Sequence, residues 1–406
     1  MHRPVSTRVA TLGAAALIVV ASGCAGPKTG SSESDGTNTI VIGASLPLSG
    51  PLAGFGGSQK WGYEHALKEV NAAGGIDIDG SRRKVELKIL DDKSDPNQVS
   101  QNTQTLISSN KVSALLGSCT PALVTAGAVV AERAKVPFVT GCSPLQAFTS
   151  VKEWTYAWDI FFDESDVGAL PFDTLKSQKI STNKKVAILH DNGPDGTVVG
   201  GQIWPSLAKQ HGYKVVANVE FPTDNTDFSA AVQQAKGSGA DILLVSAVTP
   251  QAVSIRKQMA TAGYEPKFIQ MEKGAEPLQF AQALGSLADG VTVGAYWDPS
   301  FPYKGAKDLA AAYEKESGGS QSQHIADSYT VAKVLLDAVA RAGSTENDAV
   351  NDAIRWTSGT YPVGPVLFSS DNTAKLPMVE VQWQNGKTVV VWPSDATTGK
   401  FLSPAS

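Results

Sequence analysis

Two segments of the chain place a serine and then Thr-Pro directly after a short apolar run. They are ALLGSCTPA at 114–122 and ILLVSAVTPQ at 242–251. Thr favours the N-cap of a helix and Pro suits its first position, so each segment predicts a strand followed by a helix. The free N–H groups at a helix start favour an anion, and open α/β sheets bind ligands at the carboxyl ends of their strands. Helix capping alone also explains each segment, but their duplication predicts two similar lobes that face a shared crevice.

The sequence contains no recognisable catalytic or metal-binding motif. G-x-S-x-G, H-E-x-x-H and G-x-x-x-x-G-K-[ST] are all absent. The segment at 54–59 resembles a dinucleotide fingerprint except that Gln59 replaces the third glycine, so we interpret it as a loop that lets the backbone approach a ligand. The histidines form no i, i+4 pair, and the best catalytic candidate, His190-Asp191, lacks an identifiable nucleophile. We therefore expect no enzymatic activity, no metal and no cofactor.

The composition is typical of a folded globular protein. Hydrophobic residues make up 42% and charged residues 18% of 406 residues. At about one domain per 150 residues, this length predicts two or three domains. The net charge of −5 leaves no basic surplus to neutralise phosphates, so we do not expect nucleic acid as a partner.

The N-terminal segment is typical of an export signal. Arg3 and Arg8 precede an apolar run at 9–21, which is too short to span a bilayer core of about 30 Å. The run ends in ASGC, which resembles the lipobox of bacterial lipoproteins and implies cleavage before Cys24, acylation of its sulfur, and an anchor on the outer face of the cell membrane. Secretion with Cys24 as a bystander is the alternative. We predict a signal peptide at 1–23 and a flexible polar tether at 24–38.

The rest of the chain alternates between predicted strands and helices. Strands are predicted at 39–44, 85–89, 112–117, 136–140, 185–190, 214–219, 241–246 and 267–271. Helices are predicted at 58–73, 96–110 and 121–134, with helix-like segments between the later strands. This alternation predicts an α/β fold with parallel sheets covered by helices on both faces.

Five segments together resemble the type I periplasmic binding proteins of ABC importers, in the branched-chain amino-acid (Leu/Ile/Val) binding group. They are IVIGASLPLSGPLAGFG at 40–56, GYEHALKEVNAAGGI at 62–76, LDDKSDPNQ at 90–98, DFSAAVQQAKGSGADILLVS at 227–246 and ADSY at 326–329. The resemblance implies two Rossmann-like, doubly wound lobes joined by a three-crossover hinge that closes on a small solute. It places lobe 1 at 39–162 and 295–376, and lobe 2 at 163–294 and 377–406. It also implies a monomer that delivers its solute to an importer permease.

The resemblance implies a ligand site built from both lobes. Phe55 corresponds to an aromatic wall residue, and Thr120 to a residue that grips an α-carboxylate with its hydroxyl and backbone N–H. The next loop supplies Cys142 or Ser143, a choice that stays open because the loop is shifted by one residue. The full set of candidates is Ser49, Phe55, Ser118, Thr120, Cys142, Ser143, Phe162, Asp163, Glu164, Asp195, Val248 and Glu272.

The same comparison predicts the chemistry of the ligand. Asp163-Glu164 and Glu272 correspond to acids that meet an ammonium group, whereas Asp195 and Val248 replace aromatic residues. An amino group could still be held, but the side-chain end of the pocket is rebuilt. We expect a carboxylate-bearing solute, either an amino acid or an aromatic or aliphatic acid. A lipoprotein that senses this solute for a membrane partner is the alternative function.

The two remaining cysteines predict a disulfide. Cys119 and Cys142 each follow a predicted strand, and one helix connects the two strands, so the strand ends should be neighbours. Neighbouring strands lie about 4.8 Å apart, within the roughly 4.4–6.8 Å Cα separation of a disulfide. Export makes oxidation permissible. Two free buried thiols are the alternative.

Overall fold

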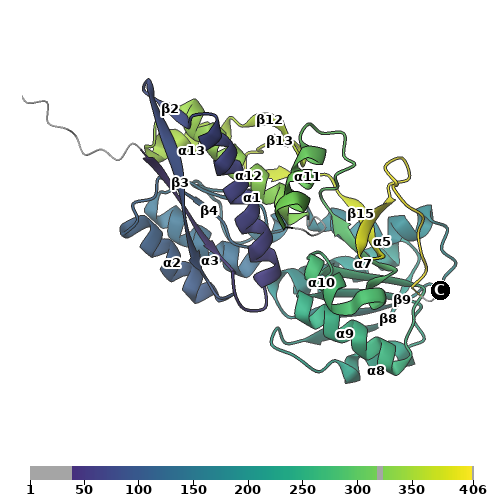
Figure 1. The fold of residues 1–406 in the computed structure, drawn as a ribbon. Coiled ribbons are helices and arrows are strands. Elements are labelled where there is room, and N and C mark those ends of the chain that lie inside the picture. Colours follow the sequence, from purple (N-terminus) through teal and green to yellow (C-terminus); the bar gives the residue numbers. More distant parts are fainter. Residues whose placement is uncertain (1–38, 318–322, 405–406) are drawn as a thin grey trace, which may run out of the picture. The chain divides into compact units, whose positions relative to one another are not determined.

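Two seven-stranded sheets organise the chain, for which a computed structural model describes residues 39–317 and 323–404 (Figure 1). The first sheet has the order β14-β6-β5-β4-β1-β3-β2 and the second β16-β15-β11-β10-β9-β7-β8. The first contains β1 (Thr39–Leu46), β2 (Ile76–Ile78), β3 (Ser81–Asp91), β4 (Ala114–Leu116), β5 (Phe138–Thr140), β6 (Ala157–Phe161) and β14 (Thr373–Lys375). The second contains β7 (Lys185–Asp191), β8 (Lys214–Phe221), β9 (Ile242–Ala247), β10 (Phe268–Lys273), β11 (Val291–Ala295), β15 (Val379–Gln384) and β16 (Lys387–Trp392).

Helices pack on each sheet, and we call each sheet with its helices a lobe. Lobe 1 carries α1 (Ala53–Ala72), α2 (Pro96–Ser108), α3 (Pro121–Ala134), α4 (Leu145–Thr149), α11 (Ala306–Ser317), α12 (His324–Ala342), α13 (Asn347–Arg355) and the ribbon of β12 (Ser358–Tyr361) and β13 (Gly364–Leu367). Lobe 2 carries α5 (Glu164–Ser177), α6 (Pro194–Val198), α7 (Trp204–Gln210), α8 (Ser229–Gly237), α9 (Thr249–Ala262) and α10 (Leu278–Leu284).

The central strands are parallel and buried on both faces. In β9, every residue of ILLVSA is buried, as expected for a strand that helices cover on both sides. The antiparallel pairs lie at sheet edges, where β2 pairs with β3 and β15 pairs with both β11 and β16. The predicted α/β fold with parallel sheets is therefore confirmed.

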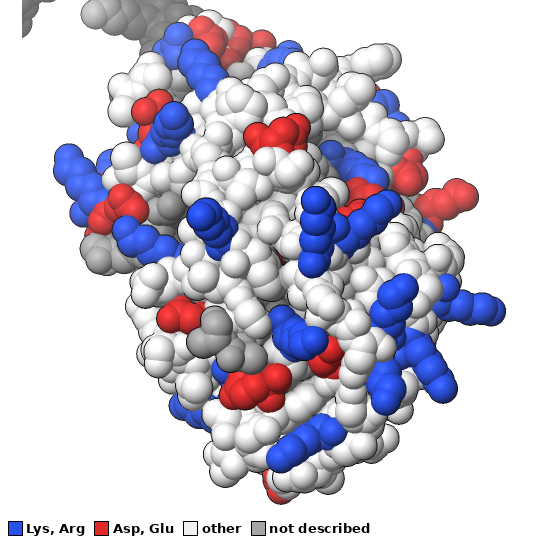
Figure 2. Space-filling view, turned by 90° about the vertical axis from the view of Figure 1, so that its right-hand side faces the viewer, with Lys and Arg blue, Asp and Glu red and all other residues white. Residues whose placement is uncertain are grey.

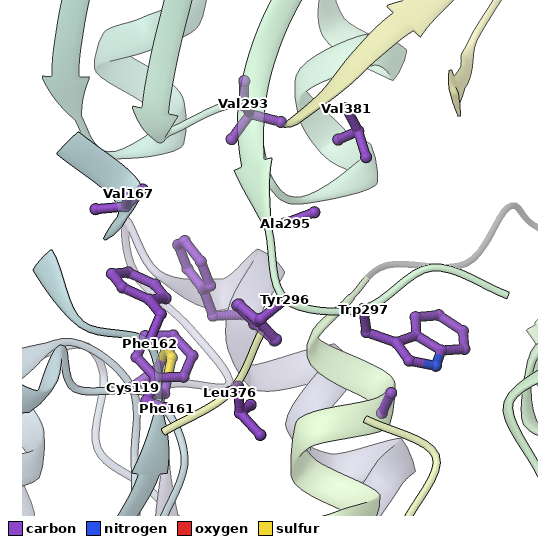
Figure 3. Packing of buried hydrophobic residues seen from close by; sticks show 14 of the residues in the cluster. Cys119, Phe161, Phe162, Val167, Val293, Ala295, Tyr296, Trp297, Leu376 and Val381 are labelled. Atoms are coloured by element: carbon purple, nitrogen blue, oxygen red, sulfur yellow. A yellow bond between two sulfur atoms is a disulfide. The ribbon is translucent and has the colours of Figure 1, made fainter. Parts of the chain in front are cut away.

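The chain crosses between the lobes three times. The crossovers lie at 162–163 between β6 and α5, at 296–305 between β11 and α11, and at 376–378 between β14 and β15. Aromatic rings pack them together, because Phe161 lies 4.3 Å from Phe162 and 4.8 Å from Tyr296 between ring centroids (Figure 3). The predicted three-crossover hinge is confirmed, and its centre is apolar.

The helices α1 and α12 run side by side in lobe 1 (Figure 1), and a glycine determines how closely they approach each other. A Cβ atom at Gly62 would lie 2.8 Å from the carbonyl oxygen of Ile325 and 2.8 Å from the backbone nitrogen of Tyr329. Only glycine therefore permits this spacing. The approach brings the ring of Phe55, near the start of α1, to 4.8 Å from the ring of His324.

The glycine-rich segment at 54–59 is helical, and our interpretation of it as a ligand-approach loop is wrong. The helix begins at Ala53, and a Cβ at Gly56 would lie 2.1 Å from the carbonyl oxygen of Pro47. Gly56 therefore lets the first turn of α1 pack against the end of β1.

The two Thr-Pro segments begin helices, but neither threonine caps its helix as predicted. Thr120 occupies the N-cap of α3 with φ of 73°, and its side chain makes no capping hydrogen bond. In α9, Val248 is the N-cap and Thr249 is the first helical residue. The strand-to-helix prediction holds at both places, while the capping chemistry does not.

The predicted signal peptide, tether and Cys24 lie outside the described residues. Within 39–317 and 323–404, no helix has the length and apolar character needed to cross a bilayer. On the face shown in Figure 2, Lys and Arg side chains are interspersed with Asp and Glu.

Candidate functional site

A cavity of about 440 Å³, including solvent at its mouth, lies between the lobes at the carboxyl ends of their strands. Lobe 1 and its first crossover line it with Phe55, Cys119, Thr120, Pro121, Cys142, Pro144, Phe161, Phe162 and His324. Lobe 2 lines it with Val167, Asp195, Val199, Ser246, Glu272, Lys273 and Glu276. The lining combines apolar rings with a few ionisable groups, which is typical of a site for a small organic molecule.

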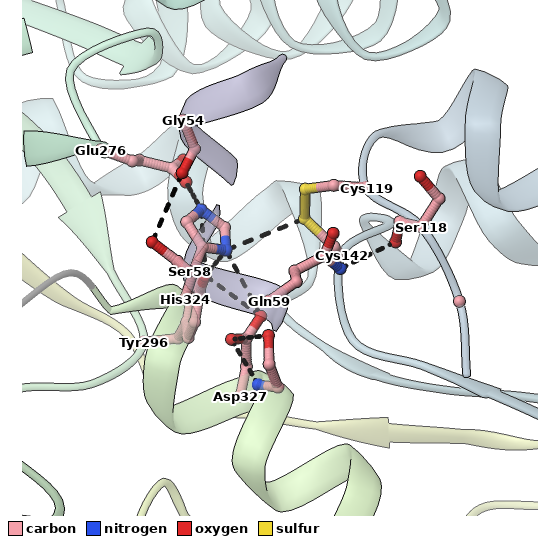
Figure 4. Close-up of a disulfide and its surroundings, with 12 residues drawn as sticks. Gly54, Ser58, Gln59, Ser118, Cys119, Cys142, Glu276, Tyr296, His324 and Asp327 are labelled. Carbon is pink, nitrogen blue, oxygen red and sulfur yellow. Dashed lines mark hydrogen bonds and ion pairs between the residues drawn. A yellow bond between two sulfur atoms is a disulfide. The ribbon is translucent and has the colours of Figure 1, made fainter. Parts of the chain in front are cut away.

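A disulfide joins two loops of the cavity wall. Cys119, after β4, is bonded to Cys142, after β5, with a Cα separation of 4.8 Å (Figure 4). Both cysteines are buried. The bond fixes the loop of Thr120, whose positive φ is a strained conformation for a β-branched residue.

The backbone N–H of Thr120 is already used within lobe 1. It donates to the carbonyl oxygen of Cys142 at 2.9 Å. This contact ties the two disulfide-linked loops together, and the predicted contact of this N–H with a carboxylate stays a prediction. The hydroxyl of Thr120 is the group that can still face a ligand.

An aromatic wall closes one side of the cavity. Phe55, Phe161 and Phe162 all line it, and all three are largely buried. Flat rings provide apolar area for an aliphatic or aromatic group of a ligand.

Glu272 brings a buried carboxyl group to the lobe 2 side. Its Oε2 accepts a hydrogen bond from Gln270 Nε2 at 3.2 Å, while Oε1 has no partner among the described residues. Burial, together with the carboxylates of Glu276 and Glu380, raises the pKa of Glu272 well above its ordinary value. Burial thus favours the neutral form of Glu272, and Oε1 remains available to a donor on a ligand.

A histidine and a glutamate meet across the cavity. His324 Nε2 lies 2.6 Å from Glu276 Oε2, and the side chains are 1% and 5% exposed (Figure 4). Burial alone lowers the pKa of His324, but hydrogen bonds to Asp327 and Glu276 raise it to about 9. Sequence reasoning missed this pair because His324 has no titratable partner at helical spacing except Asp327, and Glu276 is 48 residues away. The position of His324 two residues before the ADSY segment was the available signal.

Lys273 was also missed, and it forms ion pairs with Asp191 and Asp195. Its Nζ lies 2.7 Å from Asp191 Oδ2 and 2.9 Å from Asp195 Oδ2. Burial lowers the pKa of Lys273, but the carboxylates of Asp195 and Asp191 outweigh this and raise it above its ordinary value. Asp195 thus lines the cavity as a member of an ion-paired triad.

Residues 39–388 match the family model of periplasmic binding proteins. The chain belongs to this family. It is 27% identical over 387 residues to Leu/Ile/Val-binding protein homolog 7 of Brucella suis, which covers 90% of this chain and 94% of that protein. The comparison confirms the resemblance to the type I, branched-chain amino-acid group.

Solved structures of periplasmic binding proteins share the fold. LivJ, the branched-chain amino acid transporter substrate binding protein of Streptococcus pneumoniae, in complex with isoleucine, aligns with a TM-score of 0.76 at 25% identity over 86% of this chain and 97% of its own. A solute binding protein of an ABC transporter from Rhodopseudomonas palustris, in complex with 3,4-dihydroxybenzoic acid, aligns with a TM-score of 0.75 at 20% identity over 86% and 95%. These relatives are binding proteins rather than enzymes, and membership of the family indicates a location outside the cytoplasm.

In this periplasmic binding protein, six of the twelve predicted ligand residues line the cavity. They are Phe55, Thr120, Cys142, Phe162, Asp195 and Glu272. Val248 instead lines a second hollow, which shares Thr120, Asp195 and Lys273 with the cavity. The remaining five predicted residues lie elsewhere.

Three of these five are serines, and two have hydroxyls engaged by acids. Ser49 Oγ donates to Asp91 at 2.7 Å on the surface, and Ser118 Oγ donates to Asp92 at 2.9 Å in the interior. Ser143 is fully buried, and its Oγ has no partner among the described residues. Ser49 and Ser118 organise their loops, and neither lines the cavity.

Asp163 and Glu164 hold helix ends instead of lining the cavity. Asp163 accepts the N–H of Ser165 at 2.8 Å as the N-cap of α5. Glu164 accepts the N–H groups of Gln146 and Ala147, each at 2.7 Å, at the start of α4. Burial raises the pKa of Glu164 to about 7. The helix starts occupy both oxygens of Glu164 and one of Asp163, and the contact of these acids with a ligand ammonium stays a prediction.

Proposed function

We propose that the chain is an extracytoplasmic lipoprotein that captures a small carboxylate-bearing solute between its lobes and delivers it to an ABC importer permease. The observation that carries the proposal is the cavity at the strand ends of both lobes, with an apolar wall and few polar groups. Its family and the hinge of three crossovers support capture by closure.

The cavity favours an amino acid within this class of ligands. Phe55, Phe161 and Phe162 suit an apolar side chain, and the Thr120 hydroxyl suits a carboxylate at the start of α3. Glu272 Oε1 supplies an acceptor for an ammonium group, which a benzoate-like acid lacks. The isoleucine bound by LivJ has all three groups, whereas the ligand of the Rhodopseudomonas protein lacks the ammonium.

Calorimetry of the mature chain with L-isoleucine, L-leucine and benzoate tests the ligand class. We expect Thr120→Val to weaken binding by about ten- to a hundred-fold, because a hydrogen bond to a charged group is worth roughly 1.5–3 kcal/mol. Ser49→Ala is the matched control, since it removes a hydroxyl outside the cavity, and it should leave affinity unchanged. Equal binding of the carboxamide analogue, or no binding of any carboxylate, would contradict the proposal.

The anchor is tested separately in the full chain. We expect Cys24→Ser to abolish labelling by a radioactive fatty acid and to release the protein from the membrane fraction. A Cys24→Ser protein that stays with the membrane would show that the sulfur is not the point of attachment.

A further inference from the structure

The contact between Glu276 and His324 joins the two lobes inside the ligand cavity. His324 is the first residue of α12 in lobe 1, and Glu276 lies between β10 and α10 in lobe 2. Their 2.6 Å contact is almost completely shielded from solvent. Glu276 follows β10 directly and moves with lobe 2, whereas His324 moves with lobe 1. Separating the lobes must therefore break this contact.

Most other groups around His324 stay with it when the lobes separate. Asp327 Oδ2 lies 3.4 Å from Nδ1 on the same helix, and Cys142 Sγ, held in the disulfide, lies 3.8 Å from it. The hydroxyl of Tyr296, in the second crossover, lies 2.6 Å from Nδ1. The Phe55 ring packs against the imidazole from α1.

The ionisable groups of lobe 2 that line the cavity move away from His324 when the lobes separate. Glu272 and Lys273 line the same cavity as Glu276, and all three belong to lobe 2. Glu272 accepts a hydrogen bond from Gln270 within lobe 2, and Lys273 is paired with Asp191 and Asp195. Glu276 is therefore the carboxylate whose contact with the imidazole depends on lobe closure.

We propose that Glu276 and His324 are positioning residues that form a proton-dependent latch, which stabilises the closed arrangement of the lobes. This rests on the proposed function, in which closure of the lobes captures the solute. A neutral imidazole loses the ion pair with Glu276, so the latch requires the extra proton.

The direction of the pH dependence follows from linkage. Hydrogen bonds to Asp327 and Glu276 outweigh burial and hold the pKa of His324 at about 9 in the closed form. In this proposal, the loss of the Glu276 ion pair on opening outweighs the hydration of the ring, so the pKa of His324 falls. Asp327 stays on the same helix, so the open-form pKa lies between the ordinary value of about 6.5 and the closed-form value of about 9. The latch is thus fully present below the open-form pKa and is lost as the pH rises through about 9. Between these values the closed-to-open ratio falls by up to about tenfold per pH unit.

Small-angle scattering of the mature chain without any solute tests the latch. We expect the radius of gyration to increase between pH 6.5 and pH 10, with a closed-to-open ratio at least about tenfold lower at pH 10. Glu276→Gln, His324→Gln and the double variant should each be expanded at pH 6.5 and should respond little to pH. The double variant should expand no further than either single variant, because each change removes the same contact.

His211→Gln is the matched control. His211 stacks on Phe172 within lobe 2, with ring centroids 5.3 Å apart, so this variant should keep the wild-type response. Circular dichroism of each variant at both pH values establishes that it is folded.

Three results would overturn the latch. They are a wild-type radius that does not change with pH, a Glu276→Gln variant with the wild-type pH response, and additive expansion in the double variant. Because the measurement contains no solute, a chain that binds no carboxylate but keeps the pH response would contradict the proposed function and leave the latch standing.

Discussion

Glu272 is a residue whose contributions to stability and to binding should oppose each other. Its buried Oε1 has no partner among the described residues, which is costly in the ligand-free protein. The same oxygen is the acceptor that our proposed function assigns to a ligand ammonium. A side chain kept at a cost to folding is typical of a binding site.

We predict that Glu272→Gln stabilises the ligand-free protein at pH 8. The folded state raises the pKa of Glu272, so it binds one more proton than the unfolded state above about pH 4.3, and the free energy of unfolding falls as the pH rises. Gln does not titrate, so the variant avoids this decrease in the free energy of unfolding. The difference in the free energy of unfolding between the variant and the wild type should therefore grow from pH 5 to pH 8 in urea titrations. Glu86→Gln, an exposed control, should show no such trend.

The same variant distinguishes the two ligand classes. Binding of an amino acid should weaken, whereas binding of benzoate should stay equal or improve. Unchanged binding of an amino acid that the wild type holds tightly would show that Glu272 does not meet the ammonium.

The site could be predicted from sequence only where the family resemblance supplied a position. Phe55, Thr120 and Glu272 were found in that way and line the cavity. His324 and Lys273 were missed because their partners come from other elements of the fold. The hydrogen bonds of Asp163 and Glu164 to helix starts were not predicted, because a carboxylate that holds a helix start and one that holds an ammonium have the same sequence signal.

At the scale of elements, burial explains which parts of the fold were predictable. The parallel strand β9 is a continuous apolar run, and it was predicted within one residue of each observed end, whereas the prediction of β3 missed its first four residues. The start of α1 was missed because its glycines are poor helix formers. Gly56 is required there by its packing against Pro47, and sequence periodicity does not reveal such a tertiary contact. The strands β6, β11, β14, β15 and β16 were not predicted.

The disulfide between β4 and β5 gives an element-scale prediction. Mass spectrometry of the unreduced, unfolded mature chain should find no alkylatable thiol. Replacing both Cys119 and Cys142 by Ala should lower the free energy of unfolding by about 3 kcal/mol, because the bond closes a loop of only 23 residues. Binding should weaken as well, since the loop of Thr120 is no longer fixed. Two alkylatable thiols in the wild type would contradict the prediction.

The contact of α1 with α12 gives a second element-scale prediction. We expect Gly62→Ala to destabilise the protein by about 1–3 kcal/mol, because the added Cβ meets backbone atoms of α12 that cannot move independently. Gly57→Ala is the matched control in the same helix, with open space around its Cβ, and should stabilise by about 0.5–1 kcal/mol. Chemical denaturation measures both. Equal effects of the two substitutions would show that the helices are not held at this distance.

At the scale of the whole molecule, closure should be measurable with a solute. At pH 10, where the latch is lost, we expect a solute that binds to decrease the radius of gyration, and light scattering should report a monomer with and without the solute. A hinge of three crossovers allows the lobes to rotate without disturbing either sheet. A bound protein with an unchanged radius would contradict capture by closure.

The order of the strands also governs how the newly made chain acquires its structure. Lobe 1 receives β14 and lobe 2 receives β15 and β16 from residues 373–392, near the end of a chain of 406 residues. Synthesis and export proceed from the N-terminus, so neither sheet can be completed until residues 373–392 have been delivered. The late formation of these long-range pairings should keep the chain open while it crosses the membrane and concentrate its folding into the moments after release.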